Sequence, residues 1–118
     1  MTDDKTAKIR EQNDLTRRQL FAPHWARSIP CSVCHTQGIE GFSDDEREQI
    51  YVIVRDFGDF TEDNDPHQEH DFGAFDFKGQ KIFWKIDYYA HDLQHGSENP
   101  ADLKQTMRVL TILLASEY

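Results

Sequence analysis

The sequence of 118 residues has little cysteine and no long hydrophobic segment. Two cysteines are too few for a disulfide-rich scaffold, and no apolar run approaches the ~20 residues that a membrane-spanning helix needs. The first twenty residues also lack the apolar centre of a secretory signal. We therefore expect a cytoplasmic protein with reduced thiols, folded as a single domain over residues 1–118.

Basic residues are outnumbered by acidic ones, 13 to 22, and the stretch from Asp56 to Asp76 has no Lys or Arg. The net charge is -9, and residues 40–76 hold thirteen acids against two bases, so they contain the whole negative excess. This charge repels nucleic acid and attracts cations or basic protein surfaces, so we expect no direct binding of DNA or RNA. Four phenylalanines within the stretch predict that it is folded, because such rings need a core to pack in.

Two helices are predicted. The first covers residues 4–20, carries a thin apolar stripe, and ends before Pro23. The second follows Ser43, which forms a capping-box pattern with Glu46, and ends near Gly58. Apolar residues with helical spacing in the second helix predict that one face packs on a core.

The strand pattern predicts a β-hairpin at about residues 70–89, turning at Gly79. Residues 106–115 favour a strand paired with residues 81–89, although a helix also fits their spacing of leucines. Residues 28–34 indicate a short edge strand. The predicted fold class is α+β, a small and mostly antiparallel sheet with a central hairpin and two helices packed on or beside it.

Two groups of residues could hold a metal. Oxygen and imidazole ligands are concentrated in the loop DNDPHQEHD, which suggests a metal-dependent hydrolase or nuclease built from Asp65, His67, Glu69, His70 and Asp71. In the alternative, Asp63, Asn64 and Asp65 cap turns by bonding backbone amides, and His70 and Asp71 brace the hairpin. Zinc is the candidate metal for the motif CSVCH through Cys31, Cys34 and His35, and the alternative there is two half-buried thiols at a sheet edge. No other cofactor is expected.

The favoured hypothesis is a binding protein without catalytic residues. Carboxylates spaced on a folded scaffold can imitate the phosphates of a nucleic acid and occupy the basic surface of a nucleic-acid-binding protein. The residues expected to contact such a partner are acidic: Asp44, Asp45, Asp59, Glu62, Asp63, Asp65 and Glu69.

Five segments, KIREQNDLTRRQL, FTEDNDPHQEHDFGAF, FWKIDYY, HGSENPAD and RVLTILLASEY, resemble an uncharacterised bacterial family known as domain of unknown function 3768. The resemblance covers about residues 4–118 and is weakest between Pro23 and Gly41, which include the cysteines. It implies no chemistry, but it does imply a setting on plasmids, phages and other mobile elements. The expected partner is then a host defence nuclease, either a CRISPR effector or a restriction enzyme, which the protein would inhibit.

Overall fold

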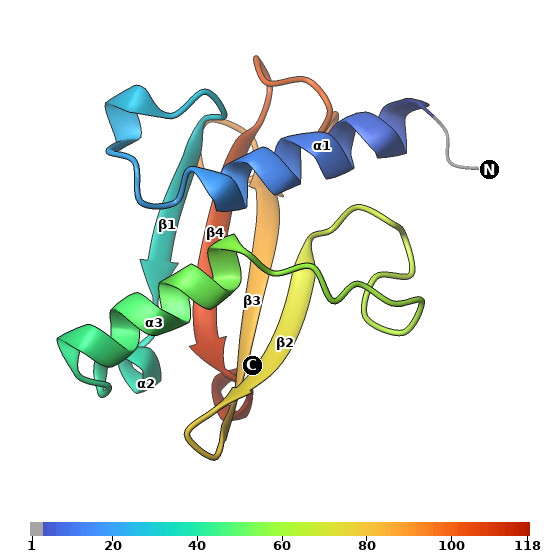
Figure 1. Ribbon diagram of the computed structural model, residues 1–118. Coiled ribbons are helices and arrows are strands. Elements are labelled where there is room, and N and C mark those ends of the chain that lie inside the picture. Colours follow the sequence, from blue (N-terminus) through green and yellow to red (C-terminus); the bar gives the residue numbers. More distant parts are fainter. Residues whose placement is uncertain (1–3) are drawn as a thin grey trace.

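The computed structural model describes residues 4–118, in which helices pack on one side of a four-stranded sheet (Figure 1). The α-helices of this range are α1 (Asp4–Arg18), α2 (Gln37–Glu40) and α3 (Asp44–Arg55). The strands are β1 (Cys31–His35), β2 (Phe72–Phe77), β3 (Gln80–Tyr89) and β4 (Met107–Leu114). Two short 3-10 helices are η1 (His24–Ala26) and η2 (Ala115–Glu117). This architecture confirms the predicted α+β class.

The strands lie in the order β1-β4-β3-β2. β2 and β3 form the predicted antiparallel hairpin, and β4 pairs antiparallel with β3 from Ile82↔Leu114 to Tyr89↔Met107. The segment 106–115 is therefore a strand, and its helical alternative is wrong. β1 lies at the edge, as predicted, and runs parallel to β4.

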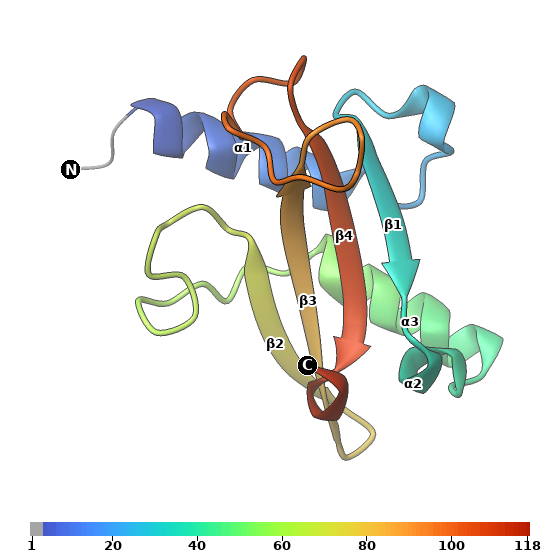
Figure 2. The same ribbon diagram turned by 180° about the vertical axis from the view of Figure 1, so that it is seen from behind.

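The helices leave one face of the sheet uncovered. α1 and α3 cross the face seen in Figure 1, whereas the view from behind in Figure 2 shows no helix across the strands apart from η2 at one end. The main core lies between α3 and the sheet, where alternate strand residues point toward the helix. Its fully or nearly fully buried members are Leu20, Ile39, Ile50, Val54, Ile82, Trp84, Ile86, Leu110 and Ile112.

α3 begins where the sequence predicts. The Ser43 side chain accepts a hydrogen bond from the Glu46 backbone, and the Glu46 carboxylate accepts one from the Ser43 backbone. This capping box satisfies donors that the helix itself cannot use. The buried residues Ile50 and Val54 then face the sheet, so capping and periodicity act together in fixing the helix.

α1 differs from the prediction in the chemistry of its buried face. Its thin apolar stripe predicts a helix that lies on a surface or meets a partner, but the face that packs on the protein is mostly polar. Ile9 is the one apolar residue among its buried positions, whereas Leu15 is exposed. The buried polar side chains of α1 are Gln12, Asn13, Thr16 and Arg17.

A buried hydrogen-bond network around Arg108 explains this polar face. Arg108 on β4 is fully buried, and its Nε donates to Asn13 Oδ1 at 2.7 Å while one Nη donates to Gln12 Oε1 at 2.9 Å. Asn13 Nδ2 donates to the Tyr88 hydroxyl at 2.7 Å and to the Glu69 carbonyl at 3.0 Å. Burial lowers the pKa of Arg108, because the charged form loses hydration. α1 is thus docked by partners for a buried charge, which a hydrophobic pattern does not show.

Candidate functional site

The acidic segment 56–71 connects α3 to β2 and is folded, as its aromatic residues predict. Phe60 turns inward and packs edge-to-face against Phe57, with ring centroids 5.1 Å apart. Asn64 closes the first turn of the loop, because its Oδ1 accepts from the Thr61 backbone at 2.9 Å and its own backbone donates to the Thr61 hydroxyl. The sequence hypothesis that Asn64 caps a turn is confirmed.

His70 occupies the centre of the site. Its Nδ1 lies 2.8 Å from Asp14 Oδ1, its Nε2 lies 3.5 Å from Asp65 Oδ2, and its ring stacks on Phe60 with centroids 3.7 Å apart. The His70 backbone also donates to Asp65 Oδ1 at 3.0 Å. The backbone at His70 and at Gln68 has positive φ, 56° and 58°. Such conformations are uncommon for residues with side chains and cluster at functional sites.

Arg17 contacts two partners of His70, the Asp14 carboxylate and the Phe60 ring. Its guanidinium is 2.6 Å from Asp14 Oδ1 and lies over the ring of Phe60 at 5.3 Å from the centroid. It also donates to the Phe57 carbonyl at 2.8 Å, just beyond the end of α3. Burial lowers the pKa of Arg17, although Asp14 acts in the opposite direction. The Asp14 carboxylate therefore joins a buried cation to the imidazole of His70.

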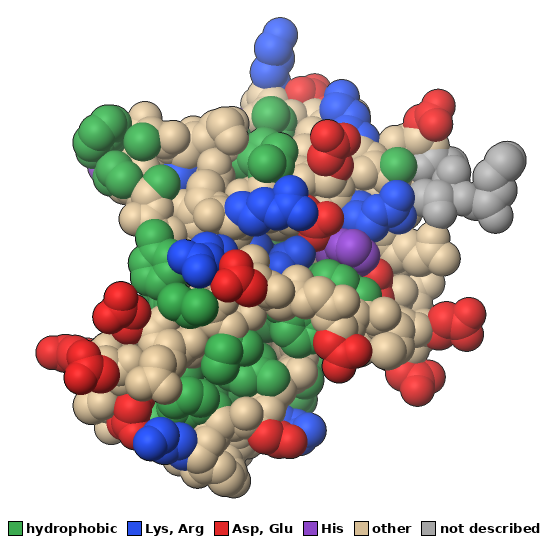
Figure 3. All heavy atoms as spheres, in the orientation of Figure 1, with side chains coloured by type: hydrophobic (Ala, Val, Ile, Leu, Met, Phe, Trp, Pro, Cys, Tyr) green, Lys and Arg blue, Asp and Glu red, His purple; other side chains and the backbone are tan. Residues whose placement is uncertain are grey.

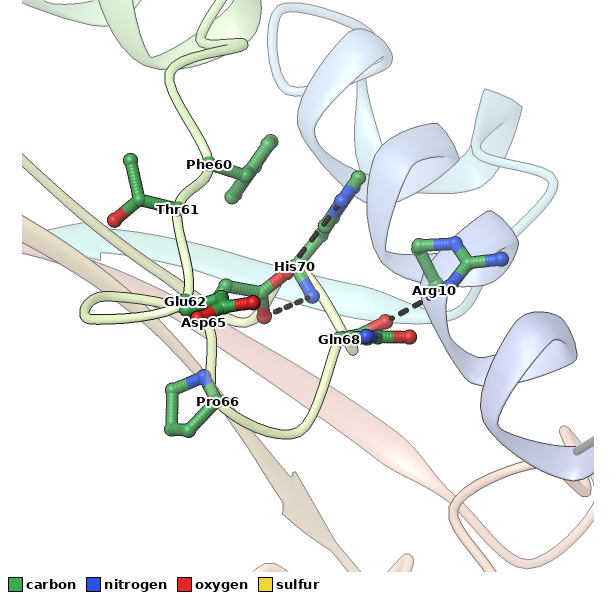
Figure 4. A pocket seen from close by; sticks show the side chains of 8 residues that line it. All are labelled: Arg10, Phe60, Thr61, Glu62, Asp65, Pro66, Gln68 and His70. Carbon is green, nitrogen blue, oxygen red and sulfur yellow. Dashed lines mark hydrogen bonds and ion pairs between the residues drawn. The ribbon is translucent and has the colours of Figure 1, made fainter. Parts of the chain in front are cut away.

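A pocket of about 590 Å³ lies in front of His70, between α1 and the loop. Figure 4 shows Arg10 on the helix side and the loop residues on the other, with Arg10 donating to the Gln68 carbonyl at 3.2 Å. The side chains of Glu62, Asp65 and His70 all line the pocket. Sequence reasoning named these three residues but missed Arg10 and Asp14, because nothing in the spacing of α1 indicates that it faces the loop.

The residues predicted to contact a partner divide into two groups. Asp44, Asp45, Asp59, Glu62 and Asp63 are exposed, and Asp44 is ion-paired with Arg47. The prediction is wrong for Asp65 and Glu69, because neither is presented to solvent as a free carboxylate. Asp65 is buried against His70, and Glu69 is half-buried and accepts a hydrogen bond from the Tyr88 hydroxyl at 2.8 Å. Burial, with Glu69 beside it, raises the pKa of Tyr88.

The acidic charge does not form one continuous face. In Figure 3 the acidic side chains of the lower half gather at its two ends, over α3 and over the loop, with hydrophobic side chains between them. Lys and Arg side chains gather along α1 above them. Acidic and basic residues that are separate in the sequence are therefore only partly separate in the structure, because α1 brings bases next to the acidic segment.

The other loop residues do not converge on the pocket. His67 is exposed, and Asp71 belongs to the hairpin, where its carbonyl accepts from the Ile86 backbone at 2.9 Å. Burial raises the pKa of Asp71, and the negative charge of Glu69 adds to the effect. The hypothesis that Asp71 braces the hairpin is confirmed for its backbone, whereas His70 instead links the loop to α1.

The expected zinc ligands are separated by the strand that carries them. Cys31 and Cys34 are three residues apart in β1, so their side chains project to opposite faces of the sheet, one buried and one exposed. Burial raises the pKa of the Cys31 thiol, which disfavours the thiolate that binds zinc. His35 is paired with Tyr51 at 2.7 Å and with Glu40. Across residues 4–118 no three His, Cys, Asp or Glu side chains are already placed to hold a metal.

The family described as protein of unknown function (DUF3768) matches residues 35–117. The chain belongs to this family. The DUF3768 match contains α3, the loop and three of the strands, but α1 with Arg10, Asp14 and Arg17 precedes it, although the sequence resemblance extends to residue 4. No curated protein and no solved structure matches the chain. The described residues contain no helix long and apolar enough to cross a membrane.

Proposed function

We propose that this member of the DUF3768 family is a binding protein whose exposed carboxylates contact a basic surface of a nucleic-acid-binding protein. One observation carries the proposal. Within residues 40–76, five exposed carboxylates form no ion pair with any side chain of the described protein: Asp45, Glu48, Asp59, Glu62 and Asp63. An incoming cation therefore breaks no internal salt bridge when it binds them.

These carboxylates stand on ordered backbone. Asp45 and Glu48 lie on α3, whose start is fixed by the capping box of Ser43. Asp59 precedes the turn that Asn64 closes and Asp63 lies within it, and the Asn64 side chain also donates to the Asp59 carbonyl at 2.9 Å. Because the scaffold is already ordered, little conformational entropy is lost on binding, and the charges accelerate association.

The class of partner follows from charge and setting together. A protein groove that holds DNA or RNA is lined by Lys and Arg, which fixed carboxylates can engage in place of phosphates. The mobile-element setting that the family resemblance implies directs the proposal to a defence nuclease of the host. A CRISPR effector or a restriction enzyme is the expected target, and the protein would inhibit it by occupying the groove.

The test is DNA cleavage by a guide-loaded CRISPR effector and by a restriction endonuclease, each titrated with the protein at low and high salt. Asp59→Lys and Asp63→Lys, singly and combined, are expected to raise the inhibitory concentration by about tenfold or more. Inhibition by the unmodified protein should weaken as salt rises, because the interface is exposed and charged.

Glu98→Lys supplies the matched control, since Glu98 is exposed in the loop between β3 and β4 and undergoes the same change of charge. Circular dichroism should show that all variants are folded, because neither the Asp59 nor the Asp63 carboxylate bonds within the described protein. The proposal fails if the double variant inhibits like the unmodified protein, or if Glu98→Lys loses inhibition to the same extent.

A further inference from the structure

We propose that the pocket in front of His70 binds a divalent transition-metal ion, with His70 Nε2 and Asp65 Oδ2 as ligands and Glu62 completing the set. His70 and Asp65 are not among the residues that carry the proposed partner contact, whereas Glu62 belongs to both sets. The metal site rests on the two ligand atoms, on the carboxylate behind the imidazole, and on the cavity that they face.

The hydrogen-bond partners of His70 determine where its ring hydrogens lie. A carboxylate only accepts hydrogen bonds, so Nδ1, which is 2.8 Å from Asp14 Oδ1, carries the hydrogen of that contact. In neutral imidazole Nε2 then presents a lone pair. It faces Asp65 Oδ2, which is also an acceptor, at 3.5 Å. Two acceptors at that distance are unfavourable unless a cation lies between them, which is either a proton on Nε2, making the ring an imidazolium, or a metal ion.

The separation of these two atoms suits a metal better than a hydrogen bond. A good N–H···O bond has a donor–acceptor distance of about 2.7–3.2 Å, shorter than the 3.5 Å between His70 Nε2 and Asp65 Oδ2. With metal–ligand bonds of about 2.1 Å, neighbouring ligand atoms lie roughly 3.0 Å apart in an octahedral site and 3.4 Å apart in a tetrahedral one. The observed spacing is close to the second value, so small side-chain adjustments suffice.

The surroundings of His70 are those of a metal ligand. A histidine that binds a metal usually donates its other ring hydrogen to a carboxylate, as His70 does to Asp14. That carboxylate is held by Arg17, and Asp65 is fixed by the His70 backbone, so both ligands are preorganised. The loop is further constrained by the positive φ at His70.

Glu62 is the third ligand available from the protein. It lines the same pocket and is exposed, so its side chain is free to turn toward the ion, and water fills the remaining positions (Figure 4). Imidazole with carboxylates favours Mn²⁺ or Zn²⁺ over Ca²⁺ and Mg²⁺. Arg10 and Arg17 offset part of the negative charge, so we expect a dissociation constant in the micromolar range.

Mn²⁺ is the probe for this site, because it avoids the exposed thiol of Cys34 and broadens nearby NMR signals. In the unmodified protein we expect titration with Mn²⁺ to broaden the amide signals of Glu62, Asp65 and His70 first, and an excess of Mg²⁺ to leave the effect in place. Broadening centred instead on Asp59 and Asp63, or on the exposed pair Asp92 and His95, would overturn the proposal, as would no binding at all.

Single substitutions at His70, His67 and Asp14 provide a second test of the metal site. His70→Gln should abolish the broadening at this pocket, whereas the matched change His67→Gln, at an exposed position of the same loop, should leave it unchanged. Asp14→Asn keeps a hydrogen-bond acceptor but removes the charge, and is expected to weaken Mn²⁺ binding by about 10–100-fold. Unchanged binding in His70→Gln refutes the site. If His70→Gln does not fold, the titration of the unmodified protein still decides. Nuclease inhibition measured in EDTA tests the partner contact separately.

Discussion

Replacing Asn13 by alanine should test whether a polar network docks α1 on the sheet. Asn13 is fully buried and makes three hydrogen bonds, to Tyr88, to Glu69 and from Arg108. The Tyr88 hydroxyl keeps its bond to the Glu69 carboxylate, but the Glu69 carbonyl and the charged Nε of Arg108 lose theirs. A buried group left unpaired costs about 1–3 kcal/mol, and more when it is charged, so we expect a loss of about 3–4 kcal/mol.

This loss is large against the about 5–15 kcal/mol that stabilises a typical domain. For a domain of this size it corresponds to a fall of roughly 12–16 °C in melting temperature. Urea denaturation followed by tryptophan fluorescence measures it, because Trp84 lies in the core near Arg17. Glu11→Ala, at the adjacent exposed position of α1, is the control and should change stability by less than about 0.5 kcal/mol. A loss below about 1 kcal/mol in Asn13→Ala would refute the docking argument.

Two further predictions concern packing and pH. Gly73→Ala should lower stability by about 1–3 kcal/mol in a thermal melt, because the added Cβ would lie 2.2 Å from the indole nitrogen of Trp84. Gly58→Ala is the control and should cost nothing, because a Cβ at that position meets nothing within 4 Å. Equal effects at both positions would contradict the packing argument. Hydrogen bonds from the Thr36 hydroxyl and two backbone amides hold the pKa of Glu117 below its ordinary value, so its contribution is present near neutral pH and is lost as pH falls through that lowered pKa. Glu117→Gln should therefore lower the free energy of unfolding by less than about 1 kcal/mol at neutral pH. In urea denaturation repeated at decreasing pH, the variant and the unmodified protein should become equally stable. A difference in stability that persists at low pH would exclude the charge of Glu117 as its cause.

Local signals were sufficient to predict most of the fold. The capping box at Ser43 and the apolar spacing after it determine α3, because both act within a few residues of the chain. The hairpin follows from alternation around Gly79, which has a φ of 80° that glycine adopts freely. The parallel pairing of β1 with β4 was not predictable in this way, because the partners lie more than seventy residues apart and the five residues of β1 have no pattern that fixes a direction.

The candidate site was predictable only on its loop side. Asp65 and His70 are close in sequence, and their residue types indicate a shared role. Asp14 comes from a helix 56 residues away, and its contact with His70 depends on how α1 is rotated. That rotation is set by Gln12 and Asn13 reaching the buried Arg108, and hydrophobic periodicity does not register polar burial of this kind. The same limit explains why Glu69 was expected on the surface.

α1 precedes the residues that match DUF3768, yet the fold of those residues depends on it. Arg108 and Tyr88 lie within the matched range and are buried or half-buried, yet their side-chain partners Gln12 and Asn13 come from α1. Without α1 the guanidinium of Arg108 would lose two of its three hydrogen bonds, and a buried cation without partners is strongly destabilising. The matched residues therefore need a polar helix of this kind to fold in the form described. The same helix supplies the carboxylate behind His70, so the pocket is complete only when α1 is docked.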